Sequence, residues 1–139
     1  MDKKLKHLEM LENIIERMGN NSFQLKGWTV TLVALVGALA AQGSDKRFFL
    51  LSFIPLFAFW FLDSFYLQME RKYKIMYKRV STQNEDEIDF NMDTRSIAYS
   101  EDEAKKICFC SCLFSKTEWT FYLIITGVVG ALALILLLT

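Results

Sequence analysis

The chain has 139 residues, 53% of them hydrophobic, and its 16 basic side chains balance its 16 acidic ones, so the formal net charge is zero. A nucleic-acid-binding protein needs a basic surface, and this composition therefore argues against nucleic acid as a partner. The charged residues are also segregated from the apolar ones along the chain, which is typical of a membrane protein.

The first predicted element is an amphipathic helix over residues 1–20. Its apolar side chains recur every three or four positions, opposite a face of Lys, Glu and Arg. They are Leu5, Leu8, Leu11, Ile14, Ile15 and Met18. Acidic residues on the polar face argue against binding to anionic lipid, so we expect packing on another cytoplasmic helix. The sequence "GNNS" at 19–22 predicts a helix end followed by a new start.

Three uncharged runs follow, at 27–41, 48–62 and 119–138. A membrane-spanning helix needs about 20 mostly apolar residues. With their flanks, the runs predict spans at 25–42, 48–67 and 117–138, with an external turn at 43–47. Pro55 predicts a kink in the second span.

Two other interpretations of these runs fit the sequence less well. Three uncharged helices buried inside a soluble protein would need more covering chain than 139 residues provide. A cleaved signal peptide ending near Ala40 conflicts with the acidic residues Glu9, Glu12 and Glu16 ahead of the apolar run.

The distribution of Lys and Arg predicts the orientation in a bacterial inner membrane. Fourteen of these residues lie in the N-terminal segment and in the long loop before the third span, but only Lys46 and Arg47 lie between the first two spans. Positive residues favour the cytoplasm, so we expect the N-terminus inside and the C-terminus outside. Trp28, Tyr66, Trp119 and Tyr122 would form an aromatic belt near the cytoplasmic interface.

A helical extension of the second span is predicted over 68–80, and the remaining cytoplasmic region covers 81–115. In "EIDFNMDT" (87–94) apolar and polar residues alternate, which predicts a small β-hairpin. Ser100 with Glu103, and Ser115 with Glu118, have the spacing of capping boxes at helix starts. Candidate contacts for a cytoplasmic signal or partner are Glu70, Arg71, Lys72, Lys74, Lys78, Arg79, Asp89 and Asp93.

Lys26 and Asp63 are charged residues at the cytoplasmic ends of the first two spans. Counted at 1.5 Å per residue from the external turn, both lie at the same depth on antiparallel helices. An unpaired charge in a bilayer is unfavourable, so the sequence predicts that Lys26 and Asp63 form an intramembrane polar pair. The alternative is that Asp63 faces a cavity between subunits or an ion path.

Stripes of small residues on the first and third spans predict close helix contacts. They are Ala34, Gly37, Ala38 and Ala41 on one helix, and Gly127, Gly130, Ala131 and Ala133 on the other. Because three spans enclose little within one chain, we expect a homo-oligomer.

The sequence offers no catalytic set, so we expect neither an enzyme nor a cofactor. It has one histidine, His7, and lacks a phosphate-binding glycine loop, a nucleophile–base pair and a zinc-protease motif. Cys108, Cys110 and Cys112 lie two residues apart, without the Cys-x-x-Cys spacing or histidine partners of a metal site.

Three stretches, "NNSFQLKGW" (20–28), "FWFLDSFYLQMERKYK" (59–74) and "EIDFNMDT", resemble small bacterial membrane proteins found beside anti-phage or other conflict genes. The hairpin of spans followed by a cytoplasmic helix is similar in architecture to the two-span SLATT effectors, although the third span departs from that pattern. The resemblance implies oligomerisation and membrane perturbation on arrival of a partner or nucleotide-type signal. The positions it would carry over are Lys26, Gly27, Trp28, Trp60, Asp63, Glu70 and Arg71.

The sequence thus predicts an all-α membrane protein with three spans and a small cytoplasmic hairpin. Its predicted function is that of a homo-oligomeric inner-membrane effector, in bacterial defence, that forms a pore or perturbs the bilayer in response to a cytoplasmic protein or signal. Two alternatives remain: a membrane scaffold that recruits a cytoplasmic enzyme, and a small ion or solute transporter.

Overall fold

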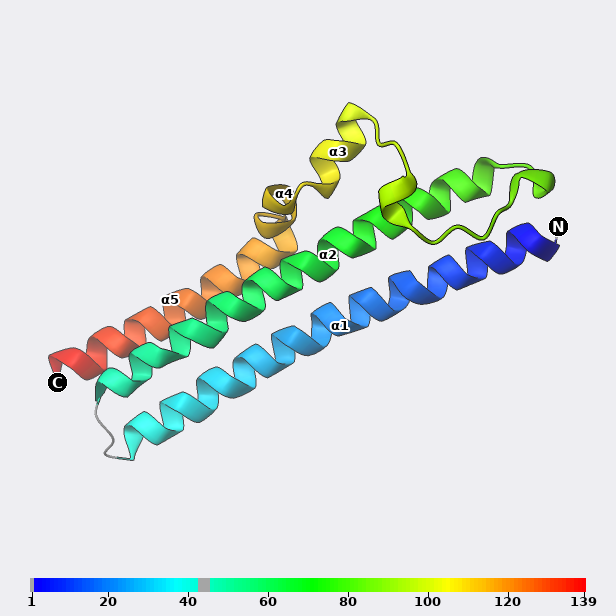
Figure 1. The fold of residues 1–139 in the computed structure, drawn as a ribbon. Helices are drawn as coiled ribbons and strands as arrows, with labels where there is room; N and C mark the ends of the chain where they lie inside the picture. The colour runs from blue at the N-terminus through cyan, green and yellow to red at the C-terminus, as the bar shows by residue number, and fades with distance from the viewer. Residues whose placement is uncertain (1, 43–45) are drawn as a thin grey trace. The chain divides into compact units, whose positions relative to one another are not determined.

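The computed structural model describes residues 2–42 and 46–139, and this part of the chain is helical without any strand (Figure 1). The predicted all-α class is therefore confirmed, and the predicted hairpin is wrong. The elements in chain order are α1 (Asp2–Ala41), η1 (Lys46–Ser52), α2 (Phe53–Thr82), η2 (Glu85–Glu87), η3 (Thr94–Ser96), α3 (Glu101–Ile107), α4 (Phe109–Leu113) and α5 (Lys116–Leu138).

The chain forms two compact units, and α1 and α2 contribute residues to both. Unit 1 comprises Met1–Ser22 and Phe65–Cys112, and unit 2 comprises Phe23–Ser64 and Leu113–Thr139. Unit 2 contains all three uncharged runs, whereas unit 1 contains most of the charged residues. The two units are therefore expected to meet different surroundings.

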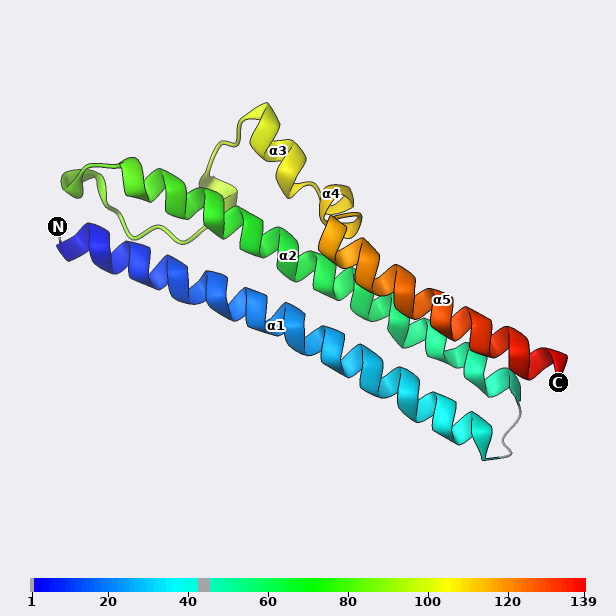
Figure 2. The same ribbon diagram turned by 180° about the vertical axis from the view of Figure 1, so that it is seen from behind.

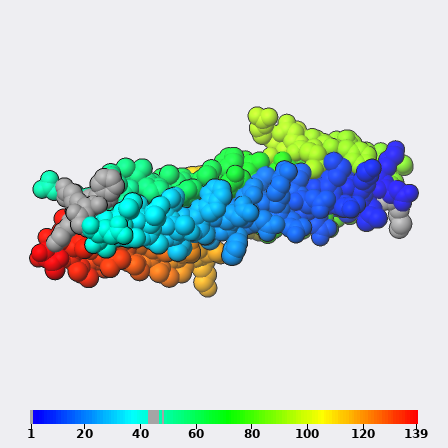
Figure 3. All heavy atoms as spheres, turned by 90° about the horizontal axis from the view of Figure 1, so that it is seen from below, coloured from blue at the N-terminus to red at the C-terminus, as the bar shows by residue number. Residues whose placement is uncertain are grey.

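Unit 2 is built from the second half of α1, the first half of α2 and all of α5. Figures 1 and 2 show α5 alongside α2 from opposite sides, and Figure 3 shows the cyan part of α1 flanked by both. Ala40, Phe49, Val129 and Ala133 form its buried apolar cluster. The absence of a side chain at Gly37 lets the Phe49 ring approach closely, since a Cβ there would lie 3.3 Å from the ring.

The outer surface of unit 2 is apolar. Leu35, Phe61 and Ile124, one from each helix, are all more than half exposed. Soluble proteins rarely expose continuous apolar surface on this scale. Three helices, within Asp2–Ala41, Phe49–Thr82 and Lys116–Leu138, are long and apolar enough to cross a membrane, which agrees with the three predicted spans.

The predicted small-residue stripes make few contacts inside the chain. Gly37 packs against Phe49, but a Cβ at Gly127 or Gly130 would meet nothing within 4 Å. Ala34, Ala38, Ala41 and Ala131 are exposed. Most of these residues therefore make little contact within one chain, whereas Ala133 belongs to the buried cluster, and the role of the stripes in helix packing stays a prediction.

Unit 1 pairs the first half of α1 with the second half of α2, and the chain between α2 and α3 packs on them. Its core contains Leu11, Met76 and Val80, with Leu8, Tyr73, Tyr77, Ile88, Met92 and Ile97 packed around it. The apolar face predicted for residues 1–20 thus lies partly against a helix of the same chain, although Leu5 remains exposed.

The predicted helix end at 19–22 is wrong, because α1 continues without a break from Asp2 to Ala41. Glycine and asparagine lower helix stability by roughly 0.5–1 kcal/mol each relative to alanine. Packing on either side offsets this: Leu11 is fully buried ahead of the segment and Leu25 is buried after it. Tertiary contacts therefore override the local signal.

Residues 88–93 belong to neither a helix nor a strand, which corrects the predicted β-hairpin. Side chains accept hydrogen bonds from backbone N–H groups that would otherwise pair the two strands of a hairpin. Asp89 accepts from Asn91 N, Asn91 from Asp93 N, and Asp93 from Arg95 N. Such i to i+2 bonds compete with sheet formation. Phe90 also has a φ of 53°, which an extended strand does not accommodate.

The entry into α2 differs from the prediction as well. The 3₁₀ helix η1 precedes α2, and Pro55 is the third residue of α2. Proline is tolerated best in a first helical turn, where N–H groups have few intrahelical acceptors, so Pro55 lies near the start of the helix and not at a mid-helix kink. Of the predicted external turn at 43–47, residues 43–45 lie outside the described residues.

Candidate functional site

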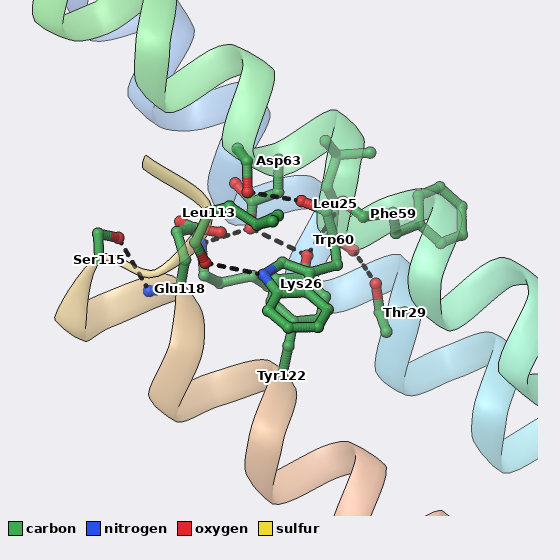
Figure 4. Close-up of polar contacts among 11 residues, drawn as sticks. Leu25, Lys26, Thr29, Phe59, Trp60, Asp63, Leu113, Ser115, Glu118 and Tyr122 are labelled. Carbon is green, nitrogen blue, oxygen red and sulfur yellow. Dashed lines mark hydrogen bonds and ion pairs between the residues drawn. The ribbon is translucent and has the colours of Figure 1, made fainter. Parts of the chain in front are cut away.

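The three helices of unit 2 bring one ammonium group and two carboxylates together (Figure 4). Lys26 Nζ of α1 lies 2.7 Å from Asp63 Oδ2 of α2 and 2.9 Å from Glu118 Oε1 of α5. We call Lys26, Asp63 and Glu118 the ionic cluster. Asp63 and Glu118 are almost completely buried, at 0% and 2% exposure, and Lys26 is 16% exposed.

Tyr122 adds a second donor to the Asp63 carboxylate. Its hydroxyl donates to Asp63 Oδ2 at 2.9 Å, and its ring is fully buried. Asp63 therefore accepts from α1 and from α5 at the same oxygen. Buried charges are stable only when paired and hydrogen-bonded, and this arrangement provides both.

Local structure explains why Glu118 faces the cluster. Ser115 is the N-cap of α5, and its side chain accepts from Glu118 N at 3.4 Å. In the predicted capping box the Glu118 side chain would turn back to the Ser115 backbone. It binds Lys26 instead, so only half of that box forms. The box predicted at Ser100 and Glu103 forms completely.

Aromatic side chains surround the ionic cluster. Trp60 stacks on Tyr122 with ring centroids 5.9 Å apart, and its Nε1 donates to Leu113 O at 3.2 Å. Lys26 Nζ lies 5.9 Å from the centroid of Phe121. The stacking on Trp60 holds Tyr122 in place, and burial of both carboxylates strengthens electrostatic attraction in the site.

One ammonium faces two carboxylates, so the ionic cluster has one excess negative charge when all three groups are ionised. Within the described chain, Glu118 Oε2 is buried and has no hydrogen-bond partner. The arrangement can join three helices electrostatically.

The sequence does not predict Glu118 and Tyr122 as parts of this site. Tyr122 is expected in an interfacial aromatic belt, yet it is buried, whereas Trp28 and Trp119 are exposed. The signal that could have found Glu118 is its place at the start of the third span. It is the only carboxylate near that end of the span, at the same end as Lys26 and Asp63.

The predicted cytoplasmic contact residues separate into two groups. The basic ones, Arg71, Lys74, Lys78 and Arg79, line hollows on α2, and Glu70 forms an ion pair with Lys74 at 3.1 Å. Lys72 lines neither of these hollows. Asp89 and Asp93 instead accept backbone hydrogen bonds in the 88–95 segment, and the bond from Arg95 N lowers the pKa of Asp93.

The three cysteines lie around α4. Cys108 and Cys110 are exposed, and Cys112 is buried. Hydrogen bonds from the backbone of Cys110 and Ser111 lower the pKa of Cys108. In the described parts of the chain, no three His, Cys, Asp or Glu side chains are grouped so that they could hold a metal ion.

Comparison with family models, curated proteins and solved structures found no match to this chain. The comparisons thus provide no relative from which a function can be transferred.

Proposed function

We propose that the protein is a homo-oligomeric effector of the bacterial inner membrane, closed at rest, that forms a pore or perturbs the bilayer when a cytoplasmic signal reaches unit 1. The observation that supports this proposal most strongly is the ionic cluster. Its three charged side chains come from three helices that are each long and apolar enough to span a membrane.

The energetics of the ionic cluster suit a contact that holds α1, α2 and α5 together in a closed state and is broken in an open state. A lone charge near the bilayer centre is unfavourable by about 2.5–3.5 kcal/mol on insertion scales, and by less near the interface. Separating α1 from α2 and α5 would leave Lys26 and the two carboxylates without their ionic partners. Water entering between the helices would then have to hydrate these charges. A closed dry arrangement and an open wet arrangement can then differ by a few kcal/mol, within reach of a bound ligand.

Two of the helices that contribute to the ionic cluster, α1 and α2, also contribute residues to unit 1. Lys26 lies four residues after Ser22, the last residue that α1 contributes to unit 1. Asp63 lies two residues before Phe65, the first that α2 contributes. A signal that alters the packing of α1 on α2 in unit 1 can therefore act on the same two helices that contribute Lys26 and Asp63 to the ionic cluster.

Oligomerisation follows from what one chain lacks. Three helices cannot enclose an aqueous path, and unit 2 exposes small residues on both α1 and α5. Small residues permit close helix contact in lipid, where van der Waals packing drives association. The resemblance to SLATT-type effectors favours a role in bacterial defence.

Dye release from proteoliposomes tests the proposal. Purified wild-type protein should retain carboxyfluorescein, whereas Lys26→Met, which leaves Asp63 and Glu118 without their cation, should release it at least about tenfold faster. Lys6→Met removes a charge from an exposed position of the same helix and is the matched control; it should behave as wild type.

If Lys26→Met inserts into the vesicles and forms the same oligomer as wild type but releases no dye, the proposal is wrong. A membrane scaffold that conducts nothing would then account better for the chain.

A further inference from the structure

The side of unit 1 formed by α2 and α3 carries two adjoining hollows of about 390 and 470 Å³. They share Lys74, Ile75 and Lys106. We call them together the basic groove. Its five basic side chains are Arg71, Lys74, Lys78, Arg79 and Lys106, and the one acidic side chain in its lining is Glu103.

Two of the five cations are neutralised by carboxylates. Lys74 forms an ion pair with Glu70 at 3.1 Å, and Arg79 forms one with Glu103. Arg79 also lies over the Tyr99 ring, 5.5 Å from its centroid. These contacts hold the two side chains in place. Lys78 also interacts electrostatically with Glu103, so five basic side chains share the single carboxylate in the lining of the groove.

Arg71 is positioned by neutral acceptors. One of its terminal nitrogens, Nη1, donates to Lys106 O at 2.7 Å and more weakly to Ser111 Oγ at 3.4 Å. Both acceptors are uncharged, so the guanidinium keeps its full charge and its other donors. The ammonium groups of Lys78 and Lys106 make no hydrogen bond or ion pair with the described residues.

We propose that the basic groove binds a phosphate-bearing ligand, and that this ligand is the cytoplasmic signal in the function proposed above. A guanidinium fixed by two acceptors can bind a phosphate through its remaining N–H groups, and flanking ammonium groups add point charges. The Ser111 hydroxyl in the lining adds an uncharged donor, whereas the Thr82 hydroxyl already donates to Arg79 O at 2.8 Å. The excess of basic side chains over carboxylates in the lining suits a ligand with more than one negative charge.

Positive residues near a membrane commonly serve only to set topology, and that role does not require them to converge. Lys72 and Lys105 belong to the same two helices as the groove residues but line neither hollow. If the lysines only set topology, substituting either pair should have the same effect on anion binding. If the groove is a ligand site, substituting Lys78 and Lys106 should weaken anion binding more than substituting Lys72 and Lys105.

This difference provides the test. Wild-type protein in phosphatidylcholine nanodiscs is titrated with inorganic pyrophosphate by calorimetry, and its thermal midpoint is compared in nanodiscs with and without phosphatidylglycerol. The groove variant is Lys78→Gln/Lys106→Gln, and the matched control is Lys72→Gln/Lys105→Gln. Both remove two positive charges from α2 and α3.

The groove variant should weaken pyrophosphate binding at least about tenfold and the control less than about twofold. A groove-dependent response to pyrophosphate indicates a soluble phosphate compound. A groove-dependent shift only with phosphatidylglycerol indicates a lipid headgroup. If neither probe gives a response, or if both variants lose the same affinity, the inference is wrong.

The two proposals can fail separately. Dye release by Lys26→Met does not depend on the groove. Leakage without phosphate binding would therefore contradict only the proposal that the groove binds a phosphate-bearing ligand. Groove-dependent binding without leakage from Lys26→Met would contradict the proposed effector function and support the ligand site.

Discussion

The Tyr122 hydroxyl donates to Asp63 Oδ2, at 2.9 Å, the same carboxylate oxygen that accepts from Lys26 at 2.7 Å. The three helices of unit 2 therefore meet at one atom. The Tyr122 ring stacks on Trp60, and Trp60 is tied to the Leu113 carbonyl just ahead of α5. Polar and aromatic contacts thus fix the position of α5 at the end where the ionic cluster lies.

Tyr122→Phe should lower the free energy of unfolding by about 0.6–1.5 kcal/mol, because it removes one donor to Asp63 and keeps the ring on Trp60. Tyr122→Leu also removes the stacking and should have a clearly larger effect. Unfolding in mixed micelles with increasing dodecyl sulfate measures both. Equal losses for the two variants would show that the stacking on Trp60 contributes nothing, and no loss for Tyr122→Phe would show that the hydroxyl contributes nothing.

Lys26→Met should reduce stability by about 3–5 kcal/mol, since it leaves two buried carboxylates without their cation. Adding Asp63→Asn and Glu118→Gln removes those charges and should recover most of the loss. The same micelle titration compares the single and triple variants. If the triple variant is less stable than Lys26→Met, the carboxylates do not act through their charge on Lys26.

Gly19→Ala should stabilise the protein by about 0.5–1 kcal/mol, because Gly19 lies inside the continuous helix α1. A Cβ at this position would lie 3.9 Å from Glu70 Oε1, an ordinary contact distance. If residue 19 instead ended a helix in the left-handed conformation, alanine would destabilise the protein. The sign of the change in unfolding free energy distinguishes the two structures.

Glu103 links the stability of unit 1 to pH. The hydrogen bond from Ser100 N and the ion pair with Arg79 lower the pKa of Glu103 in the folded protein. A carboxylate whose pKa falls on folding stabilises the protein above its unfolded pKa, and this contribution is lost as the pH falls through the folded pKa.

The wild-type thermal midpoint should therefore decrease more steeply below about pH 4.5 than that of Glu103→Gln. Parallel curves for the two proteins would contradict this role of Glu103.

The sequence was most informative where helix geometry is fixed. A rise of 1.5 Å per residue placed Lys26 and Asp63 at equal depth, and the structure brings them into contact. Glu118 is not predicted in the same way, because its spacing from Ser115 offers a local explanation as a capping residue. Nor does a sequence show which face of a third helix turns toward the first two.

Two of the errors, the helix end at 19–22 and the β-hairpin, have a common cause, which is that tertiary packing outweighed a local pattern. Gly19 and the asparagines after it indicate a helix end, but burial of Leu11 and Leu25 keeps α1 intact. The alternation of Ile88, Phe90 and Met92 indicates a strand. In the structure Ile88 and Met92 pack on the core formed by Leu11, Met76 and Val80, while asparagine and aspartate side chains bind the backbone.

The central claim is that three helices cross the membrane, and side-specific cysteine labelling tests it most directly. One variant replaces Cys108, Cys110 and Cys112 with Ser and carries Thr139→Cys; another retains only Cys108, which is exposed. In intact bacterial cells a membrane-impermeant maleimide should label the C-terminal thiol of the first variant and should reach Cys108 of the second only after permeabilisation. Labelling of both positions from the same side would mean that α5, the predicted span between them, does not cross the membrane, and would contradict the account.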